Sequence, residues 1–141
     1  MKRAKIRGLF HVHGRRSFDS FMSYRKIVDY GVRQGLDFIA VTDHDTVKGC
    51  REARRYVASR YPGSSLQVIS GIECSSDAGN IIGLFVEEDI ACREAAEVIA
   101  EIRRQGWLVV LPHPLKDHEL SRELLEGIDL VETTTPGVMR C

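Results

Sequence analysis

Ile6-Arg7-Gly8-Leu9-Phe10-His11-Val12-His13 is a short apolar run that ends in two histidines separated by one residue. Residues two apart on an extended strand point to the same side, so His11 and His13 direct two imidazoles at one point. Neutral imidazole is a common nitrogen ligand for Zn²⁺ and related divalent metals. The run therefore predicts a strand that carries part of a metal site, and other segments must complete that site.

Strand and helix signals alternate through the rest of the chain. Apolar runs predict strands at 5–12, 38–41, 67–74, 80–86, 107–111 and 128–132. Helical spacing predicts helices over 21–35, 46–60, 95–106 and 119–125, with Thr46 as a cap and Gly35 and Gly106 at helix ends. This alternation predicts one α/β domain over residues 1–141 with a largely parallel sheet. It leaves open whether the third and fourth strands form a hairpin, and whether the sheet is doubly wound or a closed barrel.

Composition excludes several classes of protein. Lys+Arg and Asp+Glu balance at 20 each, so the chain lacks the broad basic surface of a protein that grips nucleic acid through many phosphates. No apolar run approaches the roughly 18 residues that span a membrane, and we expect a cytoplasmic protein. Four scattered cysteines, without a Cys-x-x-Cys pair, argue against a zinc ribbon and a disulfide framework.

Potential ligands stand at the carboxyl ends of the predicted strands. They are His11-Val12-His13, Thr42-Asp43-His44-Asp45, Gly71-Ile72-Glu73, Pro112-His113-Pro114 and Glu132. In barrels of parallel strands the active site lies at these ends and draws on several strands. Five such ends in one chain predict a shared site. His118 lies outside the pattern and is expected at the surface or at the edge of a substrate site, and Cys74 is expected to be a buried strand residue.

These motifs, taken in order, resemble the polymerase-and-histidinol-phosphatase (PHP) family of metal-dependent phosphoesterases. The likeness rests on His11-x-His13, Ser17-Phe18-Asp19, Thr42-Asp43-His44-Asp45, Gly71-Ile72-Glu73, Pro112-His113-Pro114 and Asp129-Leu130-Val131-Glu132. It spans essentially the whole chain. The resemblance implies a distorted (β/α)7 barrel that holds up to three metal ions, with about six of the strands present here.

The resemblance also implies a set of metal ligands. His11, His13 and Glu73 would bind one metal. Glu73 would bridge to a second metal, which His113 also binds. Mixed imidazole and carboxylate ligands suit Zn²⁺, Mn²⁺ or Fe.

A third metal is implied at Asp19 and His44, either of which could also help to protonate the leaving oxygen. Arg15 and Arg16, in the loop after the first strand, are either phosphate-binding residues or solvated loop charges. The implied reaction is hydrolysis of a phosphate ester by a metal-activated water. Its substrate would be a nucleotide, an oligonucleotide or a small phosphomonoester.

The sequence departs from the family pattern in two places. Asn80 stands where many members carry a histidine, and no Asp-x-His pair follows Glu132. We therefore expect the last strand and its ligands to be missing. The chain would then be a piece of a longer protein, a short variant whose open edge is covered by a second copy, or a degenerate domain that binds without catalysis.

Two other functions compete with a phosphoesterase. Amidohydrolases also begin with His-x-His on a barrel strand, but no lysine stands where their bridging carbamate would be expected. A non-enzymatic barrel kept for binding or assembly is the second rival. In every case we expect no membrane partner, and nucleic acid only as a substrate.

Overall fold

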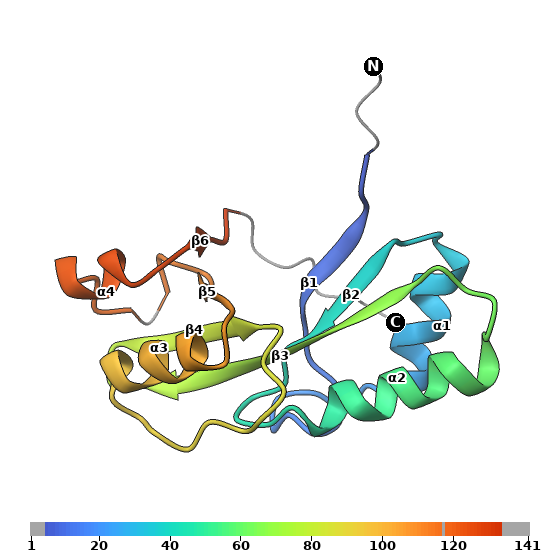
Figure 1. The fold of residues 1–141 in the computed structure, drawn as a ribbon, viewed down its shortest axis with the longest axis horizontal. Helices are drawn as coiled ribbons and strands as arrows, with labels where there is room; N and C mark the ends of the chain where they lie inside the picture. Colours follow the sequence, from blue (N-terminus) through green and yellow to red (C-terminus); the bar gives the residue numbers. More distant parts are fainter. Residues whose placement is uncertain (1–4, 117, 134–141) are drawn as a thin grey trace.

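The computed structural model describes residues 5–116 and 118–133 of the chain. Within them the strands are β1 (Gly8–Val12), β2 (Phe38–Val41), β3 (Gln67–Ser76), β4 (Gly79–Leu84), β5 (Leu108–Leu111) and β6 (Leu130–Val131). The helices are α1 (Tyr24–Arg33), α2 (Lys48–Arg60), α3 (Ala95–Arg104) and α4 (Arg122–Glu126) (Figure 1). The predicted α/β class is confirmed. None of these helices is long and apolar enough to cross a membrane.

The six strands of the described residues form one sheet in the order β1-β2-β3-β4-β5-β6. The pairs β1–β2, β2–β3 and β5–β6 are parallel, whereas β3–β4 and β4–β5 are antiparallel. The expectation of a largely parallel sheet is therefore wrong at its centre. Ser76 pairs directly with Gly79, and so short a connection can only join antiparallel strands. This hairpin resolves the alternative that the sequence left open.

The long strand β3 links the two halves of the sheet (Figure 1). Residues 67–70 pair with β2, and residues 71–76 pair with β4. Gly71 lies at the changeover, where an added Cβ would approach Thr42 Cγ2 to 2.8 Å and the Gly83 carbonyl oxygen to 3.2 Å. The glycine of Gly71-Ile72-Glu73 thus lets both neighbouring strands approach just before Glu73.

Each half of the sheet has its own helices and core (Figure 1). α1 and α2 pack against β2 and β3, around a core that includes Ile27, Ile39 and Cys50. α3 packs against β4 and β5, around a core that includes Ile81 and Ile102. The sheet curls into an open half-barrel, which brings the carboxyl ends of its outer strands toward one another.

The start of the first helix differs from its prediction. Phe21 is 99% exposed, outside the helix, and α1 begins at Tyr24 after Ser23, whose side chain accepts a hydrogen bond from the Lys26 amide. The predicted end is confirmed, because Gly35 adopts a φ of 60°, a conformation that favours glycine.

The second helix begins two residues after its predicted cap. α2 starts at Lys48, and the amide of Val47 donates to Asp89 Oδ1 at 2.7 Å. Thr46 donates its hydroxyl to the same carboxylate at 3.2 Å. Thr46 also accepts from the Lys48 amide at 3.3 Å, so Thr46 and Asp89 together accept the first amides at the start of α2.

The cysteines of the described residues agree with the absence of a disulfide framework. Cys50, Cys74 and Cys92 are free thiols, and the first two are buried. Burial raises the pKa of the Cys74 thiol to about 12, so this side chain stays neutral beside Glu73. Cys141 lies outside the described residues.

A buried hydrogen-bond network supports the loops after β1 and β2. Asp43 is fully buried and accepts from the Tyr24 hydroxyl and from the Gly14 amide, each at 2.6 Å. Burial and the Asp43 carboxylate raise the pKa of Tyr24, which therefore remains a donor at neutral pH. Gly49 of α2 packs against this pair.

Gly49→Ala is expected to destabilise the protein by about 1–3 kcal/mol, although alanine normally favours a helix. The new Cβ would lie 1.9 Å from Asp43 Oδ2 and 2.3 Å from the Tyr24 hydroxyl. Denaturant unfolding measures the change. Gly63→Ala is the control, because no atom lies within 4 Å of its Cβ position. A Gly49→Ala protein as stable as the control would contradict this account.

Candidate metal centre

His11 and His13, at the end of β1, converge on Glu73 in the middle of β3. Their Nε2 atoms lie 2.9 Å and 2.7 Å from Glu73 Oε2, and 3.0 Å from each other. Glu73 is only 1% exposed. The structure therefore brings together the three residues that the sequence assigns to the first metal.

The chemistry of this group fits a divalent cation. Ligand atoms bound to one ion at about 2.1 Å lie roughly 3 Å apart, which matches the observed spacing. Among the described residues no lysine or arginine pairs with Glu73, so its buried charge requires another cation.

The contacts within the cluster shift the pKa values of His13 and Glu73 in opposite directions. Burial alone would lower the pKa of His13, but hydrogen bonds to Glu73 and Asp19 raise it to about 9. Burial would likewise raise the pKa of Glu73, yet His11 and His13 hold it below its usual range. A bound metal ion would replace the proton, because metal ligands bind in their deprotonated forms.

A second group adjoins the first through His13. The Nδ1 atom of His13 lies 2.9 Å from Asp19 Oδ1, and His44 Nε2 lies 3.6 Å from Asp19 Oδ2. Ser17 donates to Asp19 Oδ1 at 2.6 Å and accepts from the His44 amide at 3.1 Å. Phe18 stacks on the His44 ring with centroids 4.5 Å apart. The atoms of His13, Asp19 and His44 could hold one cation.

His113, after β5, contacts the other oxygen of the central carboxylate. Its Nε2 lies 3.2 Å from Glu73 Oε1, so Glu73 offers one oxygen to His113 and the other to His11 and His13. This arrangement suits a bridging ligand. The backbone carbonyl oxygen of Asn80 lies 2.9 Å from His118 Nε2.

Arg15 and Arg16 are placed differently from the cluster residues. Both guanidinium groups pair with Glu52 of α2, and within the described ranges neither pairs with Asp19 or Glu73. Their side chains remain about half exposed. The structure therefore shows an ion pair here, and a role in phosphate binding stays a prediction.

Glu132 is the residue whose role sequence reasoning missed. It is 4% exposed, its Oε2 accepts from the His113 amide at 2.8 Å, and its Oε1 lies 3.5 Å from His11 Nδ1. Its position directly after an apolar strand was the available signal. This position does not predict which residues Glu132 contacts, because they lie on β1 and after β5, far away in the sequence.

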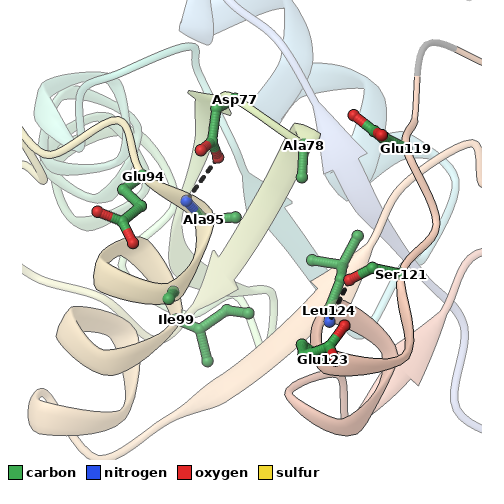
Figure 2. A pocket seen from close by; sticks show the side chains of 10 residues that line it. Asp77, Ala78, Glu94, Ala95, Ile99, Glu119, Ser121, Glu123 and Leu124 are labelled. Atoms are coloured by element: carbon green, nitrogen blue, oxygen red, sulfur yellow. Dashed lines mark hydrogen bonds between the residues drawn. The ribbon is translucent and has the colours of Figure 1, made fainter.

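A hollow of about 310 Å³ lies elsewhere, between the β3–β4 turn, α3 and α4 (Figure 2). Asp77 in its wall accepts from the Ala95 amide at 2.8 Å, and Ser121 accepts from the Leu124 amide at 3.1 Å (Figure 2). These polar groups cap helices. The hollow shares no lining residue with the histidine cluster.

A search of curated proteins finds a relative in sequence, and no family model matches the chain. An uncharacterized protein of Methanocaldococcus jannaschii is 34% identical over 97 residues, which cover 68% of this chain and 54% of that protein. The matched segment thus covers about half the length of this relative.

Solved structures share the fold at low sequence identity. A two-domain protein from Bacteroides vulgatus, containing a predicted PHP-like metal-dependent phosphoesterase, matches with a TM-score of 0.70 and 19% identity over 86% of this chain and 40% of its own. A candidate metal-dependent phosphoesterase from Bifidobacterium adolescentis matches at 0.71 and 16%, over 92% and 77%. An amidohydrolase from Chromobacterium violaceum, with bound sulfate and no metal, matches at 0.67 and 14%, over 89% and 76%.

Zn²⁺ or Mn²⁺ added to the metal-free protein is expected to raise its unfolding midpoint, because the folded cluster binds the ion more tightly than the unfolded chain does. The free energy of unfolding rises by about 2.7 kcal/mol when the free metal concentration is 100 times Kd. His13→Ala removes nitrogens from both groups and should abolish most of this gain. His118→Ala, which removes a histidine outside both groups, should keep it. An unchanged gain in His13→Ala would place the cation elsewhere.

Proposed function

We propose that this chain is a metal-dependent phosphoesterase of the PHP family. One observation carries the proposal: His11, His13 and His113 converge on the buried carboxylate of Glu73. Asp19 and His44 adjoin them. The fold supports the proposal, because two proteins that share it are named as predicted or candidate phosphoesterases.

We propose two or three divalent ions, Zn²⁺, Mn²⁺ or Fe, as the cofactors. His11, His13 and Glu73 would hold the first, Glu73 and His113 a second, and Asp19 with His44 a third. Such ions activate water for attack on an ester and neutralise charge on phosphoryl oxygens.

Glu73 and Asp19 differ in their exposure to solvent, and we assign them different roles. Glu73 is buried and contacts the three histidines, whereas the Asp19 side chain is 40% exposed to solvent. Ser17 fixes the Asp19 carboxylate through its hydroxyl. Burial would raise the pKa of Asp19, but Ser17 and His13 lower it, so Asp19 is ionised at neutral pH.

The negative charge of the cluster bears on whether a phosphate ester could bind without metal ions. Glu73, Asp19 and Glu132 bring three carboxylates to one rim, and the nearby Arg15 and Arg16 are paired with Glu52. These carboxylates would repel an anion at short range. An anionic substrate therefore requires the cations as well as the protein.

A homo-oligomer stays a prediction that concerns the edge strand β6. The side chains of Leu130 and Val131 are about half exposed, and an uncovered strand edge can pair with another strand. Sedimentation equilibrium of this chain tests it. The mass of a single chain at all concentrations would contradict the prediction.

A substrate panel tests the proposed reaction. The metal-loaded protein is expected to hydrolyse phosphomonoesters, nucleotides or short oligonucleotides, and Glu73→Gln should lower this activity more than about 100-fold, since losing a direct ligand exceeds the cost of losing a supporting residue. Glu126→Gln is the control, because Glu126 pairs with Arg122 on the surface.

The same panel separates the rival functions. Hydrolysis of amides or lactones without hydrolysis of phosphate esters would favour an amidohydrolase-type enzyme, the class of one protein that shares the fold. Metal binding without hydrolysis of any ester would favour a binding module. Phosphoesterase activity that survives Glu73→Gln would contradict the assigned centre.

A further inference from the structure

Glu132 is a buried carboxylate with no cationic side-chain partner other than histidine among the described residues. Its Oε2 accepts the His113 amide at 2.8 Å, and its Oε1 lies 3.5 Å from His11 Nδ1. A buried carboxylate is costly unless its contacts compensate the charge. Both contacts lead to residues of the candidate metal centre.

These contacts join opposite edges of the sheet. β1 and β6 stand first and last in the strand order, yet Glu132 after β6 reaches His11 of β1. His11 therefore lies between two carboxylates, with Nε2 2.9 Å from Glu73 and Nδ1 facing Glu132. One imidazole cannot present lone pairs to both without repulsion.

We propose that Glu132 is a positioning residue, which holds hydrogen on His11 Nδ1 and thereby reserves the Nε2 lone pair for a metal ion. The inference rests on the proposed metal-dependent function. Carboxylates behind metal-bound histidines fix the tautomer and the ring orientation in this way. At 3.5 Å the contact is electrostatic and not a hydrogen bond, and the buried His11 Nδ1 has no hydrogen-bond partner among the described residues. A carboxylate at this distance still favours an N–H over a lone pair.

Glu132 also holds the second histidine through its backbone. His113 adopts a φ of 30°, which is rare for a residue other than glycine. The hydrogen bond from its amide to Glu132 Oε2 stabilises this conformation. The Nε2 atom of His113 then faces Glu73 Oε1. One carboxylate thus orients ligands on β1 and after β5.

Nitrogen NMR of the zinc-loaded wild-type protein tests the tautomer directly. Long-range ¹H–¹⁵N correlations should show a protonated Nδ1 and a metal-bound Nε2 on His11. This measurement needs no variant, so it holds even where a substitution prevents folding. A metal-bound Nδ1, or hydrogen on Nε2, would overturn the inference.

Two substitutions test the energetic consequence. Glu132→Ala is expected to weaken zinc binding about 10–100-fold, with the fold checked by circular dichroism. Glu132→Gln keeps an acceptor for the His113 amide but loses the charge, so it should fold like the wild type and bind zinc more weakly. Glu123→Gln, on the exposed start of α4, is the control and should bind like the wild type.

The outcomes separate this inference from the proposed function. Zinc affinities of both Glu132 variants within about twofold of the wild type would overturn the positioning role and leave the metal centre intact. A wild-type protein that binds no zinc, manganese or iron would overturn the metal-dependent function and, with it, this role of Glu132.

Discussion

The buried charge of Glu73 is the constraint on which the rest of the structure depends. An ionised carboxylate removed from water costs several kcal/mol unless other groups compensate it. In the described part of the chain that compensation comes from histidines on β1 and after β5, and not from lysine or arginine. The sheet must curl for these strand ends to reach one carboxylate. The compensation of the Glu73 charge therefore depends on the half-barrel shape of the sheet.

The backbone places Glu73 where this convergence is achievable. Its amide donates to the Asp43 carbonyl, and its carbonyl accepts from the Asp45 amide, which holds His44 beside it. Gly71 permits the close approach of both neighbouring strands two residues earlier. Asp43 in turn anchors Tyr24 and the loop after β1. The site thus rests on hydrogen bonds formed by buried groups, which cannot exchange them for water.

The sequence predicts those features that depend on local order. Side chains at or near the carboxyl ends of strands that run in one direction share an edge of the sheet, so the strand pattern groups His11, Glu73 and His113. The sequence does not predict the antiparallel pairing of β3 and β4, because a buried apolar strand gives no sign of its neighbour's direction. Contacts between residues far apart in the sequence are not predictable from local patterns. Examples are the hydrogen bond from the Val47 amide to Asp89 and the ion pair of Arg15 with Glu52.

The role of Glu132 is of the same kind, since it depends on the curl of the whole sheet. Its carboxylate contacts His11 only because the first and last strands approach at one end. His13 adds a second link, with Nε2 on Glu73 and Nδ1 on Asp19. Each of these imidazoles has both nitrogens facing carboxylates from different segments. Substitution of a carboxylate at one strand end therefore changes which nitrogen of the facing imidazole carries hydrogen. The metal centre thus depends on several strand ends together and not on a single motif.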